Sequence, residues 1–384
     1  MRGKAEWTSG SGRNRSGLIS CGDRPHPISR RFLQRQCQAA GWGTVDRIEN
    51  AVAQAGVANR RPAAALTARF AKPSPVTTLV LSHPSYALHD TGPHHPERPD
   101  RVRAILKALE AASFAGLRRA LAPGVDRATL LRVHTARYID AIEAAGPAHG
   151  TVYLDPDTVM SPNSFEAIAH SAGGAAAAVD AVMTGSANNA FVAMRPPGHH
   201  AGMASPMGFC FFNNAAIAAR HAQAVYGAER VAILDFDVHH GNGTQEIFWS
   251  DPTVLYASSH QMPLFPGTGA RDECGEHGNI VNAPLSAGDD GARFREAVES
   301  QILPRIGSFH PDLIVISAGF DGHRHDPLGG LKLVENDFVW VTAKMMEIAE
   351  RHAKGRIVSV LEGGYALSAL GRSVVAHLKA LGGL

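Results

Sequence analysis

The chain has 384 residues, of which 45% are hydrophobic, so it can bury the core of one large domain. Its net charge of +2 is unevenly spread, because residues 1–72 hold 13 Lys and Arg against 4 Asp and Glu, whereas the remainder is acidic. The folded part therefore lacks the basic excess typical of nucleic-acid-binding domains, and we expect no stable nucleic-acid binding. Four cysteines without a Cys-x-x-Cys pair argue against a disulfide framework and favour a cytoplasmic setting. No apolar run is long enough to predict a membrane-spanning helix.

The first 75 residues differ in composition from the rest of the chain. They are rich in Arg, Ala and Ser, and prolines at positions 62, 73 and 75 end the segment. This predicts a basic N-terminal extension over 1–75 that is disordered or loosely structured, with a short helix over 45–55. Residues 76–384 are predicted to form one folded domain.

Within that domain, hydrophobic strands alternate with amphipathic helices. The first helix is expected to begin after Pro99 and to span 100–112, and Ser164 is expected to cap a long Ala-rich helix. Polar loops are expected at 89–99 and 153–163. This alternation predicts an α/β fold with a parallel sheet and a functional site at the carboxyl ends of its strands. Strands are predicted at 77–82, 190–194, 231–234, 253–257, 313–317 and 357–361, and further helices at 136–144, up to 183, and 214–226.

The stretch 231–243 is the centre of this pattern. Four apolar residues predict a strand buried on both faces, and Asp235, Asp237 and His239 follow at every second position. If the strand persists, the three side chains share one face. Buried carboxylates need compensation, and carboxylate oxygen with imidazole nitrogen suits a metal such as zinc. The alternative is a buried hydrogen-bonded cluster without a metal.

A catalytic zinc site needs a third protein ligand and one open position. Asp321 is the best candidate, because it follows the strand 313–317 through a glycine. Asp235 would then lie behind the ligands, orienting a neighbour or holding a second cation. Three nearby residues are alternatives to Asp321, namely His323, His325 and Asp326.

Other strand-end residues suggest proton transfer. His199 and His200 lie in a loop shaped by two prolines and a glycine, where carboxylates can tune their basicity. Tyr365 ends a Glu-Gly-Gly-Tyr turn and could donate a hydrogen bond to a developing oxyanion, although a packed tyrosine is the simpler alternative. Phe209 and Phe265 lie in glycine-containing loops and fit either the core or the walls of a narrow channel.

Six motifs of the chain together resemble those of one family, the zinc-dependent histone deacetylases. The resemblance covers about residues 80–384 and points to the class II branch, which includes bacterial deacetylase-like and acetylpolyamine-deacetylating amidohydrolases. The motifs are Arg-Pro-Pro-Gly-His-His-Ala at 195–201, Gly-Phe-Cys-Phe-Phe-Asn-Asn at 208–214, Asp-Phe-Asp-Val-His-His-Gly-Asn-Gly-Thr at 235–244, Phe-Pro-Gly-Thr-Gly at 265–269, Ser-Ala-Gly-Phe-Asp at 317–321 and Glu-Gly-Gly-Tyr at 362–365.

The resemblance implies the arginase/deacetylase fold, a single α/β domain over 76–384 with an eight-stranded parallel sheet flanked by helices. It implies a zinc ion held by Asp237, His239 and Asp321, and a ferrous ion remains an alternative. It also implies structural potassium. One potassium ion is expected near Asp235, Asp237, His239 and Ser258, and a second near Phe248, Asp251 and Val254.

The resemblance also implies roles around the metal. His200 matches the general acid and base, paired with Asn242, and His199 matches its partner, paired with Asp235. Tyr365 matches the residue that polarises the acyl carbonyl. The expected walls and rim of the substrate tunnel are Gly208, Phe209, Phe265 and Leu328.

The expected reaction is hydrolysis of an acyl amide, with acyl-lysine peptides or similar small acylated amines as substrates. Leu328 stands where polyamine-specific animal relatives carry a glutamate, which makes an acetylpolyamine amidohydrolase the second hypothesis. A non-catalytic module that binds acyl ligands and an arginase-type ureohydrolase are weaker alternatives. The sequence leaves homo-oligomer formation open.

Overall fold

A computed structural model describes residues 76–383 of the chain, so the helix predicted over 45–55 lies outside the described residues. Eight strands form one sheet in the order β2-β1-β5-β10-β9-β6-β7-β8, and all neighbouring strands run parallel. The predicted α/β fold with an eight-stranded parallel sheet is confirmed. The strands are β1 (Thr78–Ser82), β2 (Arg118–Leu121), β5 (Asn189–Val192), β6 (Val231–Asp235), β7 (Val254–Gln261), β8 (Ile280–Leu285), β9 (Leu313–Ala318) and β10 (Ile357–Leu361).

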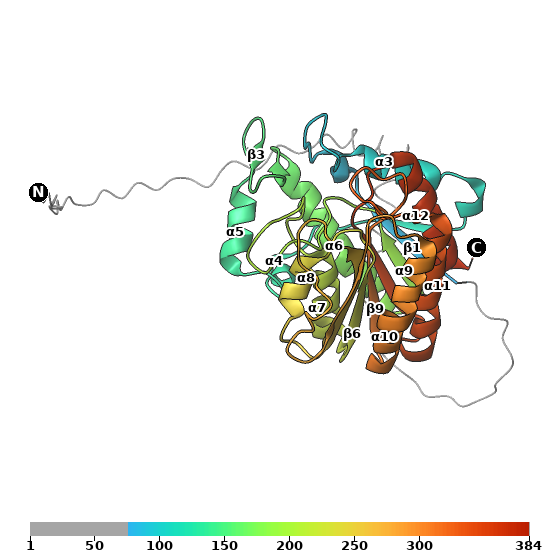
Figure 1. Cartoon of the computed structure of the whole chain (residues 1–384). Coiled ribbons are helices and arrows are strands. Elements are labelled where there is room, and N and C mark those ends of the chain that lie inside the picture. The colour runs from blue at the N-terminus through green and yellow to red at the C-terminus, as the bar shows by residue number, and fades with distance from the viewer. Residues whose placement is uncertain (1–75, 384) are drawn as a thin grey trace, which may run out of the picture.

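Helices cover both faces of the sheet (Figure 1). On one face α6 (Ser164–Met183) and α7 (Asn214–Tyr226) pack on β5, β6, β9 and β10, and α11 (Glu335–His352) and α12 (Leu367–Gly382) pack on the other. Among the described residues, no helix is long and apolar enough to cross a membrane. The remaining helices are α3 (Asp100–Ala108), α4 (Arg127–Leu130), α5 (Ala136–Ala144), α8 (Asn242–Phe248), α9 (Gly291–Ala297) and α10 (Leu303–Phe309).

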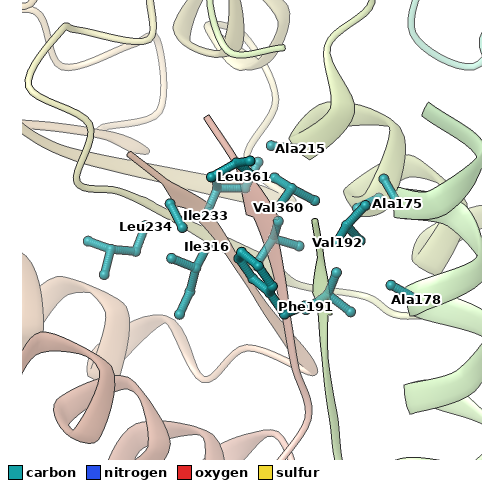
Figure 2. Close-up of a cluster of buried hydrophobic side chains, with 14 of the residues drawn as sticks. Ala175, Ala178, Phe191, Val192, Ala215, Ile233, Leu234, Ile316, Val360 and Leu361 are labelled. Carbon is teal, nitrogen blue, oxygen red and sulfur yellow. The ribbon is translucent and has the colours of Figure 1, made fainter. Parts of the chain in front are cut away.

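The core explains why the central strands are mostly apolar. All five residues of β6 and of β10 are buried, because each strand has helices above and below it. Figure 2 shows small side chains of α6, Ala175 and Ala178, beside Val192 of β5, which lets the helix approach the sheet closely. The acidic residues of these two strands therefore appear only where the strands end, whereas Ser359 inside β10 is paired with Nε2 of His377 at 2.9 Å.

Several predicted elements differ from the structure. The strands at the two edges of the sheet, β2 and β8, were not predicted, because β2 carries two arginines and β8 contains an asparagine and a proline. The predicted loop 153–163 contains a short hairpin of β3 (Val152–Tyr153) and β4 (Val159–Met160). The first helix ends at Ala108 and not at residue 112. Ser164 does not cap α6, because its hydroxyl accepts from the backbone nitrogen of Ser161.

A buried ion cluster fixes the loop that precedes α3. The Glu97 carboxylate, fully buried, accepts from Nε of Arg195 at 2.7 Å and from Nη1 of Arg101 at 3.1 Å. Arg101 also donates to the carbonyl oxygens of Gly364 and Glu362, just before Tyr365. Burial alone would raise the pKa of Glu97, but the Arg195 and Arg101 guanidinium groups hold it at about 2.

Replacing Glu97 by Gln is expected to lower the free energy of unfolding by about 3–5 kcal/mol at pH 7, because two buried guanidinium groups lose their counter-charge. A carboxyl group with a depressed pKa stabilises the fold above its ordinary value of 4.5 and loses that effect as the pH falls towards about 2. The difference in the free energy of unfolding between the wild type and Glu97→Gln, measured by urea titration, should therefore shrink as the pH falls from 4.5 towards about 2. Glu296→Gln, which breaks an exposed pair with Arg293, is the control and should change little. A pH-independent difference would contradict the charge explanation.

Candidate active site

Three side chains converge at the carboxyl edge of the sheet, where β6 and β9 lie side by side. Nδ1 of His239 lies 3.1 Å from Oδ1 of Asp237 and 3.2 Å from Oδ2 of Asp321. One ligand atom of each residue lies within 4.8 Å of the others, and all three residues are buried. The structure thus brings together the three residues that the sequence suggested as metal ligands.

The local geometry differs from the predicted one. β6 ends at Asp235, so the strand does not continue to His239 as assumed. A tight turn follows instead, in which Oδ1 of Asp237 accepts from the backbone nitrogen of His239 at 2.9 Å. Asp321 reaches the cluster from the end of β9, and its Oδ1 accepts from the backbone nitrogen of Val238 at 2.8 Å.

The polar atoms of this cluster fit a cation. Oδ2 of Asp321 is buried, and Nδ1 of His239, 3.2 Å away, is the group that faces it, although the two do not form a well-aligned hydrogen bond. One imidazole shared by two buried carboxylates leaves negative charge that is costly to bury without a cation. Burial and the neighbouring Asp237 raise the pKa of Asp321 to about 7. Gly363 leaves room beside the two carboxylates, since a Cβ atom there would lie 2.0 Å from Oδ2 of Asp321. Two carboxylates and an imidazole that converge in this way are a donor set suited to zinc or ferrous iron.

The alternative third ligands have other partners. Oδ2 of Asp326 accepts from the backbone nitrogens of Tyr365 and Ala366 at 2.7 and 3.0 Å, so it fixes the turn that carries the tyrosine. Nε2 of His323 faces Glu335 at 3.5 Å. Among the described residues, none of the three alternatives (His323, His325 and Asp326) belongs to the set that converges with Asp237.

The two adjacent histidines lie next to this cluster and have different partners. Nδ1 of His199 lies 3.0 Å from Oδ2 of Asp235, whereas Nδ1 of His200 lies 2.8 Å from Oδ1 of Asn242. Burial would lower the pKa of His199, but the Asp235 and Asp237 carboxylates raise it to about 10. Burial and the neighbouring His199 hold the pKa of His200 well below its usual range. The carboxylates thus favour the protonated form of His199, whereas burial favours the neutral form of His200.

A buried glutamate that the sequence analysis did not single out holds this loop. Oε2 of Glu362 accepts from the backbone nitrogens of Gly198 and His199 at 2.7 and 3.1 Å, and its Oε1 accepts from Oγ of Ser317. Glu362 is the first residue of the Glu-Gly-Gly-Tyr motif, so the sequence contained a signal for it, but the motif predicted a function only for Tyr365. Glu362 thus ties the end of β10 to the histidine loop.

A cavity of about 290 Å³ opens over these groups. The predicted tunnel residues Gly208, Phe209, Phe265 and Leu328 all line it, together with Tyr365. Burial raises the pKa of Tyr365 well above its usual range, so its hydroxyl keeps its proton at neutral pH. Its ring packs against Phe209 with the centroids 6.0 Å apart, and the Arg101 guanidinium lies 4.8 Å from the ring centroid. The other lining residues are Asp157, Pro197, His199, His200, His239, Leu264 and Gly363.

Asp157 is a cavity residue that the sequence analysis missed. It lies in the turn between β3 and β4, and burial and the neighbouring Asp155 raise its pKa to about 6. The Asp-Pro-Asp run in this loop was visible in the sequence, but nothing local indicates that the loop folds over a cavity lined by the segments that follow β5, β6 and β10.

Replacing Gly208 by Ala is expected to displace the His200 imidazole, and if that imidazole transfers a proton in a reaction, such a displacement lowers turnover about 10- to 100-fold. Gly208 has φ +56°, and a Cβ atom there would lie 2.4 Å from Cδ2 of His200. Gly267→Ala is the matched control, because Gly267 also has a positive φ (+85°) but no atom within 4 Å of the added Cβ. Steady-state kinetics of both variants distinguish the contact with His200 from backbone strain at a positive φ. Equal losses of turnover in the two variants would mean that backbone strain is responsible.

The residues expected at the second potassium site do not fit an ion. The carbonyl oxygens of Phe248, Asp251 and Val254 accept from Nδ2 of Asn279 at 2.7, 3.0 and 3.1 Å. An amide donor thus takes the position in which the ion was expected, and we do not propose that ion. The first potassium site, near Ser258, stays a prediction.

The chain is similar in sequence to known proteins. The sequence profile described as the histone deacetylase domain matches residues 95–381. The chain belongs to the histone deacetylase family. It is 42% identical to the histone deacetylase-like amidohydrolase of Pseudomonas aeruginosa over 276 residues, which cover 71% of this chain and 72% of the relative. A probable deacetylase of Methanothermobacter thermautotrophicus is 41% identical over 313 residues, covering 79% and 91%.

A solved structure shows that the chain also has the histone deacetylase fold. The crystal structure of the HDA15 HD domain superposes with a TM-score of 0.76 at 38% sequence identity. The match covers 80% of this chain and 88% of the solved chain. Family membership places the protein among the deacetylases and amidohydrolases. The boundary at residue 75 between the basic extension and this domain stays a prediction.

Proposed function

We propose that the protein hydrolyses the amide of acyl-lysine peptides or similar acylated amines, using a divalent cation held by Asp237, His239 and Asp321. The observation that carries this proposal is the convergence of the buried Asp237, His239 and Asp321 beside a cavity that is lined by His239, an imidazole pair and a phenol. When bound, zinc or ferrous iron would supply Lewis-acid polarisation of the acyl carbonyl and a water of lowered pKa.

The protein's own groups then divide the remaining work. Nδ1 of His200 donates to Oδ1 of Asn242, which leaves Nε2 with a lone pair that can take a proton from the attacking water. His199, paired with Asp235, supplies positive charge beside the carbonyl that is attacked. The Tyr365 hydroxyl forms no hydrogen bond with the described residues, so it is free to donate to the oxyanion. His200, once protonated, returns its proton to the leaving amine.

The cavity walls favour a narrow, uncharged chain behind the acyl group. Phe209 and Phe265 provide aromatic walls, and Phe265 is 40% exposed at the mouth. The methylene chain of an acylated lysine suits such walls because its removal from water is favourable. Asp157, also on the lining, can accept from an amide N–H of a peptide substrate.

A turnover assay with two substrates tests the proposal. Metal-replete protein is incubated with a fluorogenic acetyl-lysine peptide and, separately, with N-acetylputrescine, each with and without a hydroxamate chelator. We expect chelator-sensitive release of amine from the peptide. Release from N-acetylputrescine alone would favour the acetylpolyamine amidohydrolase, and no turnover of either by metal-loaded protein would favour a binding module.

Replacing Leu328 by Glu is expected to raise the ratio of kcat/KM for N-acetylputrescine to that for the peptide about 5- to 30-fold. Leu328 lines the cavity, where a carboxylate would attract the free ammonium group of the polyamine. Parallel kinetics on both substrates give the ratio. Leu328→Gln has a similar size without the charge, and an equal rise in that variant would contradict the electrostatic reason.

A further inference from the structure

A second group of metal-binding side chains lies outside the active-site cavity. His83 directly follows β1, and Glu166 and His170 lie one turn apart on α6. A ring nitrogen of each histidine and a carboxylate oxygen of Glu166 all lie within 4.8 Å of one another. None of the three lines the active-site cavity, so the proposed reaction does not use them.

Glu166 is unusual because it is partly buried without compensation. Its carboxylate forms no hydrogen bond or ion pair with any residue that the structure describes, and burial raises its pKa. A carboxylate removed from water in this way costs free energy unless a cation or a donor approaches it. Both imidazoles of the same cluster have a ring nitrogen within 4.8 Å of this carboxylate.

The two imidazoles lie together and differ in their hydrogen bonds. Their rings stack with the centroids 3.6 Å apart and the planes 6° apart, and burial lowers the pKa of both, that of His83 to about 3. Nδ1 of His170 donates to the carbonyl oxygen of Ala122 at 2.7 Å, which leaves its Nε2 with a free lone pair, as in many metal-binding histidines. Nδ1 of His83 accepts from the backbone nitrogen of Ser85 at 3.2 Å and lies 2.9 Å from Oγ of Ser85. His83 can therefore bind a metal through Nε2 only if its proton moves to Nδ1, which can then donate to Oγ of Ser85.

We propose that His83, Glu166 and His170 form a second cation site, which takes a divalent transition metal of the zinc class. Two imidazole nitrogens and a carboxylate oxygen are an established zinc donor set, and partial exposure leaves a position for water. Because an imidazole lone pair lies in the ring plane, the stacked rings must tilt apart when both bind one ion. The site does not depend on the proposed deacetylation.

Such an ion would tie the end of β1 to α6 beside the histidine loop. Oγ of Ser171, the residue after His170, donates to the carbonyl oxygen of Pro196 at 2.9 Å. Pro196 belongs to the loop that carries His199. A cation at this site would therefore stabilise the frame under that loop, and its main effect is on stability.

Zinc content after equilibrium dialysis of the full chain tests the site. We expect two zinc ions per chain in the wild-type protein, one in His170→Ala and one in Asp321→Asn. His352→Ala is the matched control, because the rings of His310 and His352 lie 4.6 Å apart but join no converging set of ligands among the described residues. It should keep both ions. Equal zinc content in the wild type and His170→Ala would overturn the proposal.

A second variant tests the site independently, in case His170→Ala does not fold. Glu166→Gln keeps the shape of the side chain, and we expect it to weaken zinc binding at this site at least about 10-fold. Circular dichroism and retention of the ion held by Asp237 show that the variant is folded. Unchanged affinity in Glu166→Gln would overturn the assignment of the carboxylate and with it the proposed site.

Discussion

Replacing Tyr365 by Phe is expected to lower turnover of an acetyl-lysine peptide about 100- to 1,000-fold, or about 3–4 kcal/mol, because one donor to the oxyanion is lost. The ring should stay in place, since its packing against Phe209 and beneath the Arg101 guanidinium does not involve the hydroxyl. Metal content and thermal stability should therefore match those of the wild type. Single-turnover kinetics with metal-loaded protein measure the chemical step directly.

Tyr153→Phe is the control for this prediction. Tyr153 is 64% exposed in the β3–β4 hairpin, so the same chemical change there should leave turnover unaltered. Near-normal turnover in Tyr365→Phe would refute the role of its hydroxyl. A loss of turnover accompanied by loss of the metal would instead indicate that the tyrosine supports the turn that begins at Gly363.

The site could be predicted in large part because strand ends in a parallel sheet share one edge. Asp237 and Asp321 stand 84 positions apart in the sequence, yet each follows an apolar strand, and β6 and β9 are neighbours. Their location at one edge therefore follows from the pattern of strands, and the sheet order, which places β9 beside β6, brings them together. The turn that actually orients His239 could not be predicted, because the choice between a continued strand and a side-chain-capped turn depends on packing around Asp235.

What the sequence did not reveal depends on tertiary contacts. The edge strand β2 is recognisable only through its pairing with β1, since Arg118 and Arg119 break the apolar pattern. Asp157 reaches the cavity because its loop folds against the segment before α3, where Nε2 of His95 lies 3.3 Å from the carbonyl oxygen of Asp157. Such contacts join segments whose local sequence gives no sign of each other.

Replacing Asp321 by Asn is expected to weaken zinc binding at the active site more than about 100-fold and to abolish turnover, since loss of a direct ligand exceeds the 10- to 100-fold effect of outer partners. The amide oxygen can still accept from the backbone nitrogen of Val238, so the local fold should persist. Without metal, the variant should be at least as stable as the wild type, because one of two adjacent buried carboxylates is neutralised.

The sign of the stability change separates a metal site from a structural ion cluster. Zinc should raise the denaturation midpoint of the wild type more than that of Asp321→Asn, because a ligand stabilises only the state that binds it. Asp326→Asn is the control: its carboxylate accepts from the backbone of Tyr365 and lies outside the converging set, so the variant should keep the ion even if its turnover falls. If chelated Asp321→Asn were several kcal/mol less stable than chelated wild type, His239 would be acting as the counter-ion of a structural pair, and the metal assignment would lose its support.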